Sequence, residues 1–212
     1  MTSVLPFLTY SDIKSKANVF LRKYCPSRSL PIPIERIVEY DLGLDIAPFP
    51  DLYRTHRVNA WLDLARSTIF VDDYQYHHFY EKYRFTLAHE VGHYVLHSNL
   101  YESAEFRDTE EYVEWYFSLL KRDLFWLEEH ADNFAGLVLV PAPELETLCQ
   151  RVASEYANVF KGLRIPPEDA WFHLANEVAP FFEVNQPTVH IRIRREGIPQ
   201  RILLPLDRAS TD

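Results

Sequence analysis

The chain has 212 residues, 47% of them hydrophobic, which is enough for one or two globular domains with a buried core. Its formal net charge of −9 opposes sequence-independent attraction to nucleic acid or to anionic membranes. The five glycines lie too far apart for a glycine-rich phosphate-binding loop. Composition therefore excludes the common nucleotide-binding loops and disfavours non-specific nucleic-acid binding.

The first third of the chain is predicted to hold two helices and then three strands. Residues 11–25 carry apolar side chains at helical spacing, with Ser11 as N-cap and Pro26 as the stop. A short helix follows at 33–40. Alternating apolar residues then predict strands, the last two joined as a hairpin, over residues 44–48, 58–64 and 68–71.

From residue 74 onward the pattern is mainly helical. An aromatic-rich helix is predicted over 74–97, with Asp72 or Asp73 at its acidic start. The tail over 184–205 is ambiguous between a short helix and strands. A weak boundary near residue 165 divides the chain into domains 1–165 and 166–212. Further helices are predicted over residues 108–120, 123–138, 143–160 and 167–178.

The helix over 74–97 contains His89-Glu90-Val91-Gly92-His93, an H-E-x-x-H motif. Four residues apart on a helix, His89 and His93 project from one face, so both imidazoles can bind one ion. Glu90 lies beside that face, where it can reach a metal-bound water without being a ligand. Zinc lowers the pKa of such a water, and the carboxylate takes the proton as the water attacks a carbonyl. The spacing therefore predicts zinc-dependent hydrolysis with Glu90 as the catalytic residue.

A charged, solvated helix face is the alternative interpretation of this motif. The neighbouring residues argue against it, because apolar side chains cover most of the remaining circumference. We therefore expect a buried helix whose histidines need partners. The apolar residues concerned are Phe85, Leu87, Ala88, Val91, Tyr94 and Val95.

A third ligand is predicted on the helix over 123–138. Glu128 and Asp132 share a face at i and i+4, so Glu128 can be the ligand while Asp132 holds a ligating imidazole by its other ring nitrogen. Glu129 and His130 are the competitors, but they point about 100° and 200° away from Glu128 on the same helix.

The remaining histidines are given structural or surface roles. His97 extends the series 89, 93, 97, but on a continuous helix it lies about 12 Å from His89 along the axis, too far for one ion. We interpret it as a histidine at a helix C-terminus, where the dipole favours it. His173 is expected in the core, and the residues without a partner pattern are His56, His77, His78 and His190.

The two cysteines, Cys25 and Cys149, support neither a disulfide framework nor a cysteine-based zinc site, and we expect buried thiols. The N-terminus has no basic region followed by an apolar stretch, and no apolar run of membrane-spanning length occurs. These features predict a cytoplasmic location without a membrane partner.

Residues 84–97 (RFTLAHEVGHYVLH) resemble the signature helix of the ImmA/IrrE family of zinc metallopeptidases. Residues 67–72 resemble the strand that precedes this helix in the family, and residues 128–141 resemble its third-ligand helix with a terminal proline. Residues 32–51 resemble its opening helix and strand. The resemblance covers about residues 30 to 145, whereas the acidic, aromatic stretch 102–116 has no match.

The resemblance implies an α+β fold: a mostly helical, zincin-like metallopeptidase domain of the gluzincin type with a small three-stranded sheet. It implies Zn²⁺ as cofactor, with His89, His93 and Glu128 as ligands and Glu90 as the catalytic carboxylate. It also implies site-specific cleavage of a DNA-binding repressor that belongs to a mobile element or a stress response.

The C-terminal residues 170–197 resemble, more weakly, the helix-turn-helix-like segment that follows the peptidase domain in this family. Residues 184–208 contain five arginines against two acidic residues, a local charge of +3. Direct DNA binding through Arg192, Arg194 and Arg195 is one interpretation. We favour the other, in which these arginines pair with acidic groups of the protein or of its partner.

Two hypotheses of function follow. The leading one is a zinc endopeptidase that cleaves or inactivates a helix-turn-helix repressor. The alternative is a non-proteolytic regulatory or toxin-like protein that uses the zinc fold to bind a repressor, an antitoxin or DNA. Partner binding that survives Glu90→Gln separates the second from the first.

Overall fold

The computed structural model of the chain describes residues 5–63, 65, 67–102, 106–161 and 166–204. The chain forms two compact units, Met1–Leu139 and Val140–Asp212. The predicted fold class is confirmed: helices predominate and accompany a small three-stranded sheet. The domain boundary predicted after residue 165 lies inside the second unit and stays a prediction.

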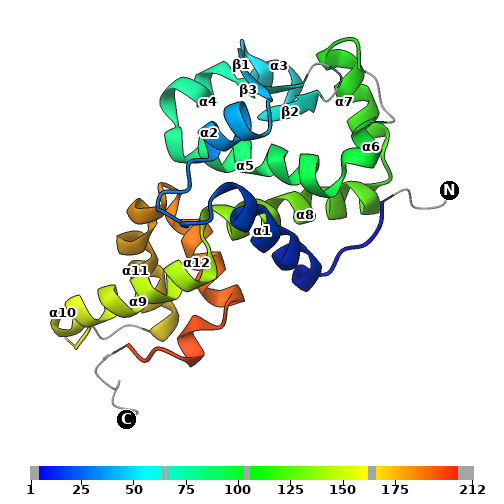
Figure 1. The fold of residues 1–212 in the computed structure, drawn as a ribbon. Helices are drawn as coiled ribbons and strands as arrows, with labels where there is room; N and C mark the ends of the chain where they lie inside the picture. The colour runs from blue at the N-terminus through cyan, green and yellow to red at the C-terminus, as the bar shows by residue number, and fades with distance from the viewer. Residues whose placement is uncertain (1–4, 64, 66, 103–105, 162–165, 205–212) are drawn as a thin grey trace. The chain divides into compact units, whose positions relative to one another are not determined.

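The first unit combines the sheet with several helices (Figure 1). Its elements in chain order are α1 (Tyr10–Tyr24), α2 (Ile34–Arg36), the π-helical turn η1 (Ile37–Asp41), β1 (Asp45–Phe49), α3 (Leu52–His56), β2 (Ala60–Asp63), β3 (Thr68–Asp72), α4 (Asp73–His78), α5 (Tyr80–Leu96), α6 (Ser98–Glu102), α7 (Thr109–Ser118) and α8 (Lys121–Leu139).

The sheet has the strand order β1-β3-β2. β1 is parallel to β3, with Ile46 opposite Ile69, and β2 is antiparallel to β3, with Leu62 opposite the same Ile69. The predicted hairpin is therefore confirmed. β3 is the central strand and is apolar, so it packs on α5 and is buried in the core.

Helix α5 lies between the sheet and α8, and α1 packs on α8 (Figure 1). Residues at 3.6-residue spacing explain the packing of α1, which buries Ile13, Ala17, Phe20 and Leu21. Its N-cap is Thr9, which forms a capping box with Asp12, rather than the predicted Ser11.

Several other differences from the predicted elements are local. The helix predicted over 74–97 is divided at Phe79, whose backbone (φ −133°, ψ 71°) separates α4 from α5. Asp72 caps α4 by accepting a hydrogen bond from the Gln75 N–H. It is one of the two residues, Asp72 and Asp73, that were predicted at the start of this helix. The short helices α3 and α6 were not predicted.

The second unit contains the helices α9 (Ala142–Glu155), α10 (Ala157–Lys161), α11 (Pro167–Phe182) and α12 (Gln186–Arg195), and the 3₁₀ turn η2 (Ile198–Gln200). The ambiguous tail is thus helical, and α11 packs on both α9 and α12. The turn between α11 and α12 has Glu183 in the left-handed region (φ 51°). Helix α11, this turn and α12 follow the order of the predicted helix-turn-helix-like segment.

The arginines of α12 differ in exposure. Arg194 and Arg195 are exposed, but Arg192 is only 3% exposed; it donates to the Val140 carbonyl and pairs with Glu196 at 2.8 Å. The suggestion that Arg192 contacts DNA is therefore wrong, because its guanidinium is buried and held by acceptors of its own unit. In the described part of the chain, no helix has the length and apolarity needed to cross a membrane.

Candidate metal centre

Helix α5 is buried along most of its length, and one buried arginine fixes it. Arg84 is 1% exposed, and its guanidinium pairs with Glu35 of α2 at 2.9 Å and donates to the Ile32 carbonyl at 2.7 Å. A charge so far from water needs such partners. The segment 32–35 therefore holds α5 near its start, five residues before His89.

Helix α5 approaches α8 closely at Gly92. A Cβ atom added at Gly92 would lie 3.0 Å from the Cα and 3.1 Å from the carbonyl oxygen of Ala131. A side chain at this position fits only if Ala131 moves by a few tenths of an ångström. This approach sets the distance between the histidines of α5 and the acidic residues of α8.

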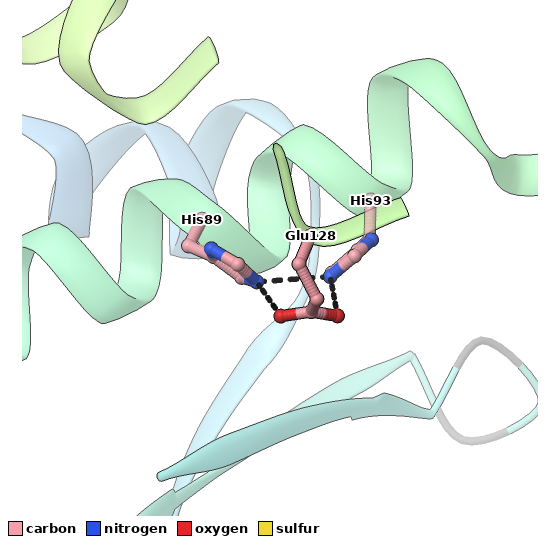
Figure 2. Close-up of side chains that lie close together, drawn as sticks. All are labelled: His89, His93 and Glu128. Carbon is pink, nitrogen blue, oxygen red and sulfur yellow. Dashed lines mark hydrogen bonds and ion pairs between the residues drawn. The ribbon is translucent and has the colours of Figure 1, made fainter. Parts of the chain in front are cut away.

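Figure 2 shows how the three predicted ligands lie: His89 and His93 project from one side of α5, and the carboxylate of Glu128, from α8, faces both rings. The two Nε2 atoms are 3.0 Å apart. The Glu128 oxygens lie 3.3 Å from Nε2 of His89 and 3.7 Å from Nε2 of His93. These three residues form a group that could hold a metal ion.

The spacing of these atoms fits zinc. Ligands at about 2.0–2.1 Å from a tetrahedral ion are about 3.3–3.4 Å apart, and the three observed separations lie around that value. Two imidazoles and one carboxylate are also a donor set that zinc accepts, and they leave a fourth position open.

Glu90 lies next to this group, at 4% exposure. Its Oε2 atom is buried and has no hydrogen-bond partner among the described residues. Burial raises the pKa of Glu90 to about 7, while the charge of His89 lowers it and that of Glu128 raises it. A buried carboxylate oxygen without a partner fits a place where a water molecule is bound and deprotonated.

Asp132, one turn after Glu128 on α8, accepts a hydrogen bond from His89 Nδ1 at 2.8 Å. Burial lowers the pKa of His89, but the bonds to Asp132 and Glu128 outweigh it and raise the pKa well above its usual value. Asp132 thus contacts the imidazole of His89, one of the predicted ligands, and Nε2 of that ring faces Glu128.

Two histidines near the group had been given other roles. His97 is the C-cap of α5, which agrees with its predicted position at a helix end. Its Nδ1 atom also lies 3.0 Å from Nδ1 of His93. Its Nε2 lies 3.3 Å from Nδ1 of His130 on α8. Burial, with the charge of His130 and then of His89, lowers the pKa of His97 to about 3. The i, i+4 spacing of His93 and His97 is the sequence signal for this contact, and it also fits the helix-end position predicted for His97.

A cleft of about 290 Å³ opens onto the group. Its lining includes His89, Glu90, Glu128 and Tyr116 of α7. Burial, with the nearby charge of Glu128, raises the pKa of Tyr116. Tyr116 belongs to the stretch 102–116 that had no counterpart in the family resemblance, so this stretch contributes to the cleft. Sequence reasoning gave no role to Tyr116, because nothing in its local pattern distinguishes it from a packing aromatic.

The remaining histidines do not belong to this group. His77 pairs with Asp73 at 3.2 Å on α4, and the ring of His78 lies tilted against that of Tyr74, with centroids 4.5 Å apart. His173 is exposed, so the expectation of a core position is wrong: it lies on the outer face of α11, whereas Trp171 and Leu174 face inward.

The M78 peptidase family model, described as the IrrE N-terminal-like domain, matches residues 51–194. The chain belongs to this family. The match includes the whole of α5 and α8, and the expected relationship to ImmA/IrrE metallopeptidases is confirmed. A comparison with curated proteins found no match. Membership of the M78 peptidase family makes the chain a protein of the metallopeptidase type, with proteins as the substrate class.

Proposed function

We propose that this M78 family member is a zinc-dependent endopeptidase that cleaves a DNA-binding transcriptional repressor. The observation that supports it best is the group of His89, His93 and Glu128, with donor atoms 3.0–3.7 Å apart, beside the buried and unpartnered oxygen of Glu90. The proposed ligands and the proposed proton acceptor all line one cleft.

Each residue of the proposed site has a separate role in the hydrolysis. His89, His93 and Glu128 would hold the ion, and Asp132 would keep the His89 ring in place through Nδ1. A bound zinc ion would polarise the substrate carbonyl and lower the pKa of its water. Glu90 would accept the proton of the attacking water at Oε2 and pass it to the leaving amine nitrogen. Tyr116 would offer its hydroxyl to the substrate carbonyl oxygen.

The substrate is inferred from the family and from the resemblance to ImmA/IrrE proteins. The family implies a protein substrate, and the resemblance implies a helix-turn-helix repressor as the partner. A substrate of this kind acts where DNA is, so we infer a cytoplasmic location.

The test compares the wild type with Glu90→Gln. Each protein is incubated with the helix-turn-helix protein whose gene lies next to the gene of this chain. We expect the wild type to give one discrete pair of fragments. The glutamine variant keeps the size of the side chain but cannot accept the proton, so cleavage should slow about 10²–10⁴-fold. Fragment masses and initial rates, measured by mass spectrometry, are the readout.

The zinc content of both proteins is the control, and we expect it to be equal, because Glu90 is not one of the proposed ligands. Cleavage by Glu90→Gln at the wild-type rate would contradict the proposal. Repressor binding by both proteins with no fragment from either would favour the non-proteolytic alternative.

A further inference from the structure

A chain of ring nitrogens connects the proposed ligand His93 with the N-terminal segment. Nδ1 of His93 lies 3.0 Å from Nδ1 of His97, and Nε2 of His97 lies 3.3 Å from Nδ1 of His130. The backbone N–H of Leu8 donates to Nε2 of His130 over 3.3 Å. The proposed hydrolysis gives no part to His97, His130 or Leu8.

The N-terminal segment is anchored on α8 at the same place. The ring of Phe7 packs edge-on against Trp126, with centroids 4.8 Å apart, and lies 6.2 Å from the ring of His130. Residues 5–9 precede the part of the chain that the family model matches. The contact therefore combines residues of the matched region with a segment outside it.

We propose that His97 positions the ring of His93 for metal binding. We also propose that a metal ion on His93 weakens the hydrogen bond from the Leu8 N–H to His130, because the two require opposite hydrogen positions on the rings of His97 and His130. This inference rests on the proposed metal site, because it requires Nε2 of His93 to be a ligand atom.

The first step follows from the valence of imidazole. A neutral ring has one N–H donor and one acceptor nitrogen, so a histidine that binds metal through Nε2 carries its hydrogen on Nδ1. In His93 this hydrogen points to Nδ1 of His97, which accepts it. Such a bond fixes the ring plane of the ligand and makes Nε2 a better donor to the metal.

The second step concerns the hydrogen bonds of the next two rings, whose donor and acceptor nitrogens are fixed by the bond between His93 and His97. When Nδ1 of His97 accepts, its hydrogen is on Nε2 and is donated to Nδ1 of His130. The hydrogen of His130 is then on Nε2, which faces the N–H of Leu8. Two donors cannot share a hydrogen bond, so the metal and Leu8 impose opposite directions on the same rings. Each ring keeps one hydrogen throughout.

When the metal binds, we expect the hydrogen bond between Leu8 and His130 to break, rather than a bond between two of the rings. His97 and His130 are 3% and 1% exposed, so an unpaired N–H between them would remain away from water. Leu8 is only partly buried, and its N–H can bind water instead. Metal binding should therefore release the backbone at Leu8, although ligands usually protect a protein from exchange.

Zinc affinity, measured by competition with a chromogenic chelator, tests the positioning role. We expect His97→Phe to bind zinc about 10–100-fold more weakly than the wild type. His97→Asn places Oδ1 where histidine has Nδ1, can still accept from His93, and should bind close to the wild type. His78→Phe makes the same replacement at an exposed histidine and is the matched control. Equal affinity in His97→Phe and the wild type would overturn the proposal.

Hydrogen exchange of the Leu8 amide tests the coupling. Zinc should speed this exchange in the wild type and slow it within α5 and α8. In His97→Asn, which has no Nε2 to reach His130, zinc should leave the Leu8 exchange unchanged. Slower or unaltered exchange at Leu8 in the zinc-bound wild type would overturn the coupling, even where His97→Phe does not fold. A wild type that binds no zinc would instead refute the metal site itself.

Discussion

Gly92 shows how one missing side chain shapes the centre. We expect Gly92→Ala to push α5 and α8 apart, because the new Cβ would meet backbone atoms of Ala131 at 3.0–3.1 Å. Overpacking of this kind costs about 1–3 kcal/mol of unfolding free energy. The same shift moves Glu128 away from the histidines, so zinc affinity should fall as well. Urea unfolding and zinc titration measure the two effects.

Gly43→Ala is the control for Gly92→Ala. Gly43 has φ +66°, so alanine is strained there, but no atom lies within 4 Å of its Cβ position. We expect a loss of about 1–2 kcal/mol from the left-handed backbone and an unchanged zinc affinity. If Gly92→Ala also kept full zinc affinity, the approach of α5 to α8 would not set the geometry of the ligands.

At the scale of single residues, the sequence predicted the pairs that lie on one helix. The spacing of His89 and His93, and of Glu128 and Asp132, follows from helix geometry alone. The contact between His97 and His130 spans 33 positions and depends on how α5 crosses α8. Local periodicity contains no information on that crossing, so this contact could not be predicted.

At the scale of elements, α2 matters to α5 although it precedes the part of the chain that the family model matches. Glu35→Gln leaves the buried guanidinium of Arg84 without its carboxylate partner. Removal of one partner of a buried pair costs about 3–5 kcal/mol. Glu35 is 26% exposed at its side chain, so we expect about 2–4 kcal/mol here, measured by urea unfolding.

The control for this substitution is Glu39→Gln, which changes an exposed residue of η1. It should alter the unfolding free energy by less than about 0.5 kcal/mol. An equally small effect of Glu35→Gln would mean that Ile32 and the remaining contacts of Arg84 are enough to hold α5.

The long elements were predictable, and the short ones were not. Helices α5 and α8 and the hairpin of β2 and β3 follow from periodicity over many residues. Helix α3 has only five residues and is flanked by Asp51 and Arg57 in the left-handed region, which no local residue preference indicates. The break at Phe79 is likewise a backbone change without glycine or proline.

At the scale of the molecule, all of the proposed centre lies in the first unit, although the family match continues into the second. Composition predicted a folded protein without phosphate-binding loops, and the family resemblance implied the fold class. The domain boundary after residue 165 rests on local punctuation and stays a prediction, whereas the division into compact units depends on contacts between distant segments.

The central claim is that α5 and α8 together hold the metal of this peptidase, and zinc X-ray absorption spectroscopy of the loaded protein tests it most directly. The account predicts one zinc per chain with nitrogen and oxygen ligands at about 2.0–2.1 Å, and outer-shell scattering from two imidazoles. A sulfur shell at about 2.3 Å, which would point to Cys25 or Cys149, or scattering from a third imidazole, would contradict it.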